Sequence, residues 1–366
     1  MQFSRRSFLA SAAAIPVLHE GLLAAMAAGP VPDTAPRPLV RLSSNENPYG
    51  PCSGACEAVS RAAPQGARYP YDAIDSLTKR LAKLHGVSPD MIVLGNGSGE
   101  ILRIAGSAFT GPGRALVTAD PTYEAPGRYA ELVGAPVQKV ALTAGDFRHD
   151  TAKMAVPKAG LIYVCNPNNP TASITPKREI AALVAALPSG SMLLVDEAYC
   201  NFAESADFES ALGYVTAGKD VIVARTFSKV YGLAGLRIGY AVARKDLAQQ
   251  MRRHVLGNNT NGLGLEAALA SLDDADLVPR NRDRINQTRR LITDWCDRNH
   301  VHYAPTQANF VFFHLGRPVE PVIKAMRDRG VMVGRPFPPL TDWMRITVGT
   351  NEEVRRFLSE YENLKA

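Results

Sequence analysis

Five short runs of consecutive apolar residues constrain the fold of this chain more than any other feature. Amphipathic stretches with helical spacing separate them, and the runs themselves cover residues 91–94, 115–117, 161–164, 192–195 and 221–223. A strand consists of consecutive apolar residues when both of its faces are buried, as in a parallel sheet covered by helices on each side. The sequence therefore predicts an α/β fold with a mostly parallel central sheet.

The chain length predicts more than one domain. With 366 residues it exceeds the usual size of a single hydrophobic core. We expect a linker and N-terminal arm at 29–55, a large domain at 56–258 and a smaller α/β domain at 259–366. The small domain is expected to contain a long polar helix at 279–299, a helix at 320–329, and strands at 310–313 and 344–348.

The first 28 residues are typical of a targeting segment rather than of a folded domain. Arg5 and Arg6 precede a short apolar stretch at 8–18, and Ala25-Met26-Ala27 offers small residues for cleavage. The pattern resembles a twin-arginine signal, which predicts export of the folded protein by that machinery, to the periplasm or beyond. The apolar stretch is too short to span a bilayer, so stable membrane insertion is not expected. The alternative is a disordered or helical tail on a cytoplasmic enzyme.

Charge and cysteine content exclude several classes of function. The formal net charge is +6, and the basic residues are dispersed along the chain, so no nucleic-acid footprint is visible. A mildly cationic site would still favour anionic substrates. The five cysteines form an odd set with no zinc-ligand spacing, which predicts free thiols and no metal site.

Lys229 lies just after the apolar run at 221–224, among hydroxyl-bearing and small residues. A partly desolvated lysine has a depressed pKa and can form a Schiff base. Thr226, Ser228 and Arg237 supply the donors that a phosphate needs. An aldehyde that carries a phosphate is pyridoxal 5'-phosphate (PLP), which proteins hold through a lysine. The competing interpretation of this segment alone is an ordinary surface lysine after a strand.

Six segments in order along the chain resemble one known family. They are Leu42-Ser43-Ser44-Asn45-Glu46-Asn47-Pro48-Tyr49-Gly50, Gly95-Asn96-Gly97-Ser98-Gly99-Glu100, Asn166-Pro167-Asn168-Asn169-Pro170-Thr171, Val195-Asp196-Glu197-Ala198-Tyr199, the Lys229 segment at 226–240, and Met344-Arg345-Ile346-Thr347-Val348-Gly349-Thr350. The chain resembles the fold-type I PLP-dependent aminotransferases of class I/II, and within them the histidinol-phosphate aminotransferase subgroup.

The resemblance implies a role for each residue that would hold the cofactor. Lys229 would carry PLP as a Schiff base and act as the catalytic base, while Asp196 would keep the pyridine nitrogen protonated. Tyr199 and Asn169 would contact the phenolic oxygen, and Tyr123 would stack on the ring.

The phosphate would be bound by residues from several segments. Ser98 and Gly99 offer backbone N–H groups at a helix start, where the helix dipole favours an anion. Thr226, Ser228 and Arg237 would complete the cup. Tyr69 would reach the phosphate of a partner subunit, which implies a homodimer with shared active sites.

Three residues are expected to bind substrate, and the chain departs from the family pattern near one of them. Arg345 would hold a carboxylate, Asn47 would close over the substrate, and Arg335 would face the variable side of the pocket. In Gly334-Arg335-Pro336 the arginine of the family's substrate-anion site is shifted by one position, and Ala172 replaces the family glycine that follows Asn-Pro-Thr. Phe337 and Trp343 predict an apolar pocket, which favours an aromatic or imidazole-bearing substrate over a phosphorylated one.

The resulting functional hypothesis is a PLP-dependent aminotransferase. It would move an amino group between an amino acid, or a histidinol-phosphate-like amine, and a 2-oxo acid. One alternative is a PLP-dependent decarboxylase or C–S lyase on the same fold. A further alternative is a non-catalytic protein that binds PLP or an amino acid.

Overall fold

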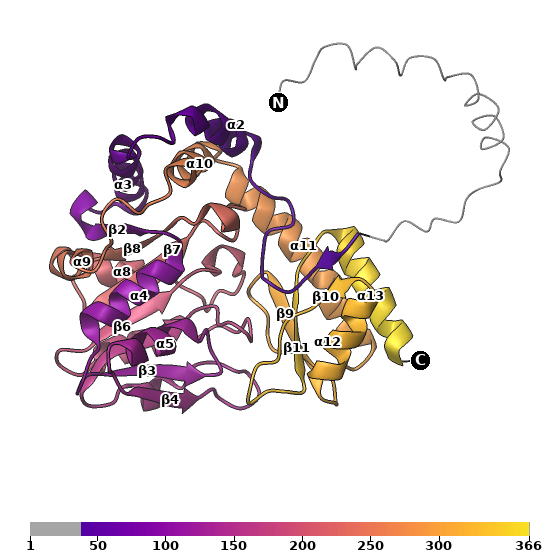
Figure 1. Ribbon diagram of the computed structural model, residues 1–366. Helices are drawn as coiled ribbons and strands as arrows, with labels where there is room; N and C mark the ends of the chain where they lie inside the picture. The colour runs from indigo at the N-terminus through magenta and orange to yellow at the C-terminus, as the bar shows by residue number, and fades with distance from the viewer. Residues whose placement is uncertain (1–37, 366) are drawn as a thin grey trace, which may run out of the picture. The chain divides into compact units, whose positions relative to one another are not determined.

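The computed structural model describes residues 38–365, so the twin-arginine segment lies outside the described part (Figure 1). A seven-stranded sheet forms the centre of the fold, in the order β2-β8-β7-β6-β5-β3-β4. Strand β8 runs antiparallel to both of its neighbours, and the other adjacent pairs are parallel. The strands are β2 Ile92–Gly95, β3 Ala115–Asp120, β4 Val137–Ala141, β5 Ala159–Cys165, β6 Met192–Asp196, β7 Val221–Thr226 and β8 Gly239–Ala243.

All five apolar runs lie in strands of this sheet, and the predicted fold class is confirmed. The sequence analysis missed β4 and β8. Strand β4 is only half-buried at the sheet edge, and its sequence lacks the continuous apolar run that marks a covered strand. Strand β8 is fully buried but follows directly after the Lys229 segment, whose loop residues obscure its start.

Helices cover both faces of the sheet, which explains the unbroken apolar runs. Along β5, Leu161 and Tyr163 pack with helices on one face, and Ile162 and Val164 pack with helices on the other. The first face carries α4 Ser98–Phe109, α5 Ala125–Leu132 and α9 Lys245–Arg252. The second carries α3 Tyr71–His85, α6 Thr151–Met154, α7 Lys177–Ala185, α8 Leu212–Thr216 and α10 Gly262–Asp273.

Helix α10 packs in the core of the large sheet, and the small-domain boundary at residue 259 stays a prediction. The sequence analysis assigned residues from 259 onward to the small domain. Helix α10 packs against α2, Ser53–Ala62, and α3, and its Leu265, Ala267 and Ala268 lie in the same hydrophobic core as the large sheet (Figure 1). The elements that pack separately from the sheet therefore begin with the next helix along the chain. The other domain boundaries stay predictions as well.

The C-terminal elements build a second core. They comprise α11 Leu277–Arg298, β9 Phe310–His314, α12 Val319–Asp328, β10 Val331–Met332, β11 Trp343–Thr347 and α13 Asn351–Lys365. The bounds of α11, β9, α12 and β11 agree with the sequence expectations to within two residues, whereas β10 and α13 were not expected from the sequence. Strands β9 and β11 pair antiparallel, and Phe310, Phe313 and Ile346 are fully buried there.

The N-terminal arm joins this second core rather than the sheet. Strand β1, Val40–Arg41, pairs parallel with β10, and Leu42 is fully buried among the C-terminal elements. The arm thereby brings residues 43–47 beside the large sheet's Lys229 loop, since Lys229 Nζ donates a hydrogen bond to the Asn45 carbonyl oxygen. Within residues 38–365, no helix is both long and apolar enough to cross a membrane.

Candidate active site

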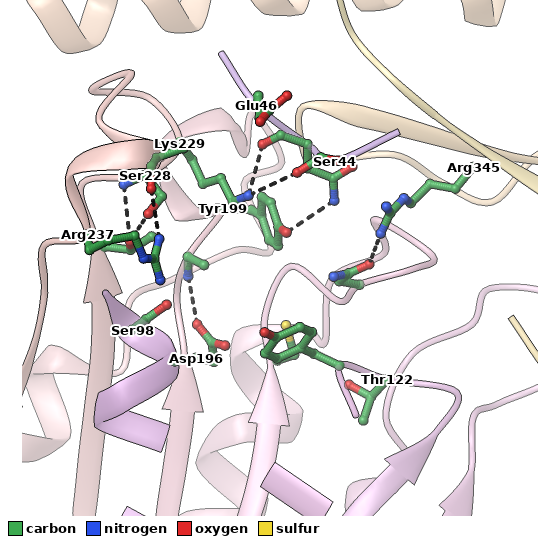
Figure 2. A pocket seen from close by; sticks show the side chains of 18 of the residues that line it. Ser44, Glu46, Ser98, Thr122, Asp196, Tyr199, Ser228, Lys229, Arg237 and Arg345 are labelled. Atoms are coloured by element: carbon green, nitrogen blue, oxygen red, sulfur yellow. Dashed lines mark hydrogen bonds between the residues drawn. The ribbon is translucent and has the colours of Figure 1, made fainter. Parts of the chain in front are cut away.

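A cavity of about 470 Å³ lies at the carboxyl ends of β5, β6 and β7. Ligands of open α/β sheets bind at this edge, because the loops that follow the strands converge there. All of the predicted site residues line the cavity except Tyr69 and Asn47. Figure 2 shows Ser98, Ser228 and Arg237 gathered at one end and Arg345 at the other, with Lys229 and Asp196 between them.

The Ser98 end of the cavity has the construction of an anion cup. Ser98 and Gly99 begin α4, whose first N–H groups have no helical partner. Gly97 precedes them with a left-handed φ of 80°, and a Cβ atom there would clash with the Arg237 guanidinium. Only glycine at 97 therefore allows the arginine to lie against the helix start.

The other donors of the cup are fixed by local hydrogen bonds. The Thr226 and Ser228 hydroxyl oxygens lie 2.9 Å apart, and the Arg237 guanidinium donates to the Ala234 carbonyl oxygen at 2.8 Å. Among the described residues, Arg237 forms no ion pair with a carboxylate. Its charge is thus available to an anion bound at the start of α4.

The Lys229 amine is uncharged to a larger extent near neutral pH than that of an ordinary lysine. Burial, reinforced by the positive charge of Arg345, lowers the pKa of Lys229 to about 8. Its Nζ atom donates to the Asn45 carbonyl oxygen at 2.9 Å and lies 5.5 Å from the centre of the Tyr199 ring. A neutral amine beside an anion cup is what a phosphorylated aldehyde requires.

Asp196, at the end of β6, is a buried carboxylate that is only 3% exposed. The Tyr163 hydroxyl donates to its Oδ2 at 3.0 Å, and the Ala198 N–H donates to its Oδ1 at 3.1 Å. Burial nevertheless raises the pKa of Asp196 to about 6. A ligand cation at this position would stabilise the charged form, and a protonated pyridine nitrogen meets that need.

The sequence analysis missed Tyr163. Its signal was available, since a tyrosine in a strand buried on both faces must find a partner for its hydroxyl. The partner lies on the neighbouring strand, where Cys165 of β5 pairs with Asp196 of β6 in the parallel register.

Tyr199 is held by a chain of hydrogen bonds from the N-terminal arm. Its hydroxyl oxygen accepts from Asn45 Nδ2 at 3.2 Å, and the Asn45 amide oxygen accepts from the Thr347 hydroxyl at 3.0 Å. Burial raises the pKa of Tyr199, so the phenol stays neutral at physiological pH. Tyr123 lines the same cavity, next to Thr122, whose hydroxyl donates to Asn168 at 2.6 Å.

Arg345 lies on β11 and is only 7% exposed. Its Nη1 donates to the Asn169 amide oxygen and its Nη2 to the Ser43 carbonyl oxygen, each at 2.6 Å, while its buried Nε has no partner among the described residues (Figure 2). Burial lowers the pKa of Arg345 to about 10, because no carboxylate is paired with it. The guanidinium therefore lacks an anionic partner, and a substrate carboxylate would be one.

Two sequence expectations are not met by the cavity lining. Asn47 turns away, with Nδ2 donating to the Val230 carbonyl oxygen at 3.0 Å and Oδ1 accepting from the Tyr49 N–H. It holds the arm against the Lys229 loop, and the adjacent Glu46 lines the cavity in its place. Trp343 also does not line it, because its ring packs on Phe312 with centroids 5.2 Å apart.

Tyr69 lies outside the cavity and is 66% exposed. In a single chain, a residue that contacts the partner subunit of a dimer is expected to be exposed. Its role stays a prediction.

The residues present fit PLP. The cavity combines an anion cup, a lysine with a lowered pKa and a buried carboxylate without a cation, which match the phosphate, the aldehyde and the pyridine nitrogen respectively. Among the described residues, no group of three His, Cys, Asp or Glu side chains is arranged to hold a metal ion. None of the five cysteines, all within the described residues, is part of a disulfide.

This combination of fold and site defines a PLP-dependent transferase, and comparison with known proteins gives the family. Residues 37–360 match the family described as aminotransferase class I and II. The chain belongs to this family, and the sequence-based expectations of an aminotransferase that uses PLP are confirmed.

Three named proteins show which members of the family this chain is similar to. A histidinol-phosphate aminotransferase of Symbiobacterium thermophilum is 37% identical over 90% of this chain and 90% of its own length. One from Moorella thermoacetica is 34% identical over 90% of this chain and 86% of its own. The crystal structure of histidinol-phosphate aminotransferase from Sinorhizobium meliloti in complex with pyridoxal-5'-phosphate is 28% identical, has a TM-score of 0.80, and covers 88% of this chain and 90% of that one.

Proposed function

We propose that this aminotransferase moves an amino group from an α-amino acid, or from a histidinol-phosphate-like amine, to a 2-oxo acid, with Lys229 as the catalytic base. One observation carries the assignment: a lysine with its pKa lowered to about 8 lies in one cavity with a buried carboxylate and an unpaired arginine. When bound, PLP supplies an electron sink for the pair of electrons left at the donor Cα.

The chain's own residues then have distinct tasks. Lys229 Nζ removes the proton from the donor Cα, for which its lowered pKa makes it a base near neutral pH. Asp196 holds the proton on the pyridine nitrogen. Arg345 binds the donor carboxylate and so fixes which face of Cα meets Lys229.

A half-reaction experiment tests this function. Purified holoenzyme is mixed with single amino donors, and the products are identified by mass spectrometry. Transamination must give a carbonyl product together with pyridoxamine phosphate. Release of CO₂ or of a thiol, with the cofactor unchanged, would instead identify the decarboxylase or C–S lyase activity. Histidinol phosphate belongs in the donor panel because of the relatives' names.

We propose further that two subunits share each active site through Tyr69. Its exposure of 66%, together with the exposed Tyr71 beside it, supports this, since both would be covered in a dimer. Mixing Tyr69→Ala subunits with Lys229→Ala subunits tests it. Heterodimers would then contain one intact site, and activity should appear that neither variant has alone. Absence of recovery in confirmed heterodimers would refute sharing.

The twin-arginine segment is proposed to direct export of the folded enzyme. A cofactor enzyme benefits from a route that carries folded proteins, because PLP is acquired in the cytoplasm. Changing Arg5 and Arg6 together to lysine should retain full-length, active enzyme in the cytoplasm, while the wild type is found in the periplasm. Identical fractionation of both proteins in a host with this pathway would contradict the proposal and favour a cytoplasmic enzyme.

A further inference from the structure

Arg335, at the cavity wall, is paired with an acidic residue from the large sheet's side. Its Nη2 donates to Glu124 Oε1 at 2.8 Å, and its Nη1 donates to the Pro336 carbonyl oxygen, also at 2.8 Å. The guanidinium carbon lies 4.4 Å from the centre of the Phe337 ring. Arg335 and Phe337 both line the cavity, so the arginine of this ion pair forms part of the surface that a substrate side chain meets, while Glu124 lines a neighbouring depression.

The backbone dictates that this cation stands at 335 rather than at 334. A Cβ atom on Gly334 would lie 2.6 Å from the Arg345 carbonyl oxygen and 3.1 Å from Arg345 Cβ. The Gly334 N–H also donates to that same oxygen at 2.9 Å. A side chain at 334 would therefore displace Arg345, and the arginine one position later reaches Glu124 instead.

Glu124 is well fixed to receive it. It is the N-cap residue of α5, where the positive end of the helix favours a carboxylate. Arg128, one turn further along α5, lies 3.4 Å from its Oε2. Glu124 directly follows Tyr123, which lines the cavity, while Glu124 itself is half-exposed and lines a neighbouring depression that Tyr123 also lines.

The charges of the cavity can be assigned one by one. When PLP and a donor are bound, Arg237 would bind the cofactor phosphate, Asp196 the pyridine nitrogen, Lys229 the aldehyde carbon, and Arg345 the donor carboxylate. Two cavity-lining charges remain for the substrate side chain, those of Glu46 and Arg335. Because Arg335 is paired with Glu124, the charge of Glu46 is the one among these cavity-lining residues that is left without an assigned partner, and it repels an anion and attracts a cation or a hydrogen-bond donor.

We propose that Glu124 is a specificity-determining residue: by pairing with Arg335 it prevents that arginine from anchoring an anionic group, and so selects donors with uncharged or cationic side chains. Phosphorylated and acidic donors are disfavoured although an arginine lines their subsite. This inference rests on the proposed transaminase function and adds the substrate class to it.

The test uses donor pairs that differ by one charge, namely L-glutamate with L-glutamine, and histidinol phosphate with histidinol. Half-reaction kcat/KM values are measured for the wild-type holoenzyme and for Glu124→Gln. We expect the wild type to prefer the uncharged member of each pair. Glu124→Gln should raise the anionic-to-neutral ratio about five- to tenfold, the effect of freeing a half-exposed cation.

Two variants serve as controls. Glu131→Gln removes the same charge from an exposed position on α5 and should leave the ratio unchanged. Adding Arg335→Gln to Glu124→Gln should cancel the gain, because no cation then remains to hold the anion. Binding of two inhibitors to the holoenzyme gives the same comparison without turnover. They are glutarate and its monoamide, in which a neutral amide replaces one carboxylate, and the measured quantity is the dissociation constant of each.

The outcomes separate the possible errors. A parallel change for all donors in Glu124→Gln would show that the ion pair only holds the cavity wall in place, and the specificity role would be wrong. An equal ratio change in Glu131→Gln, or a wild-type preference for histidinol phosphate over histidinol, would also overturn it. If holoenzyme transaminates no donor, the proposed function fails, while the two inhibitor constants still decide the role of Glu124.

Discussion

Replacing Arg345 by alanine should weaken binding of carboxylated donors selectively. The guanidinium is 7% exposed, forms two hydrogen bonds to neutral oxygens, and leaves Nε without a partner among the described residues. Burial lowers its pKa from 12.5 to about 10, which corresponds to roughly 3 kcal/mol of disfavoured charge. A bound carboxylate would offset much of this cost, and the interaction should therefore be at the strong end for a charged hydrogen bond.

A charge-assisted pair of this kind contributes about 1.5–3 kcal/mol, which predicts a loss of about ten- to a hundredfold in affinity. The assay is the half-reaction of L-histidine compared with histamine, its decarboxylated counterpart, in wild type and Arg345→Ala. L-Histidine should lose most of its advantage, and histamine should change little. Arg345→Lys should fall between the two, because lysine keeps the charge but lacks the planar fork.

Folding stability provides the control for this variant. Arg345→Ala removes two hydrogen bonds but also a buried charge without a carboxylate, so we expect the free energy of unfolding of the cofactor-free protein to change by about 1 kcal/mol or less. Equal weakening of L-histidine and histamine, with unchanged stability, would refute the carboxylate role of Arg345.

Three further predictions follow from the cofactor end of the cavity. Lys229→Ala should lose turnover by several orders of magnitude, and borohydride reduction of wild-type holoenzyme should attach the cofactor to Lys229; a tag on any other lysine would contradict the assignment. The pKa of Asp196 is raised in the folded state, from 3.8 to about 6, so its contribution to stability is present below pH 3.8 and is lost as the pH rises through 6. Urea unfolding of the cofactor-free wild type should show this loss, up to about 3 kcal/mol, and Asp196→Asn should not; the same slope in both proteins would refute the assignment of the titration to Asp196. Gly97→Ala places a methyl group against the Arg237 guanidinium at a residue with φ of 80°. The dissociation constant for PLP, measured by fluorescence titration, should therefore rise at least tenfold. Unchanged PLP affinity would show that Arg237 does not bind the phosphate.

The local pattern of the sequence was sufficient for five of the seven strands of the central sheet and for the positions of the cofactor residues. An unbroken apolar run reports that both faces of a strand are covered, and this information is local to the run. Asp196 ends one such run and Lys229 closely follows another, so their meeting at one edge of a parallel sheet followed from the fold class. The resemblance to a family added roles to residues whose positions were already constrained.

Contacts between distant segments were decided only by the tertiary structure. The carboxylate of Glu124 meets Arg335, 211 residues away, and no periodicity in either segment encodes that meeting. In the N-terminal arm, the sequence pointed to Asn47, whereas packing against the Lys229 loop turns Asn47 inward and leaves Glu46 at the cavity.

Helix α10 and Tyr163 illustrate the same limit for packing. The amphipathic pattern of a helix indicates that one face is buried, but it does not indicate which core that face packs against. Helix α10 packs against the core of the large sheet rather than against the C-terminal elements. Tyr163 needed a hydrogen-bond partner in a covered strand, and the strand order, with β5 beside β6, supplied Asp196. The sequence by itself determined which residues are buried and which chemistry they carry, because burial is encoded in the local pattern. The three-dimensional packing determined the partners of these residues, because a partner depends on which elements lie side by side.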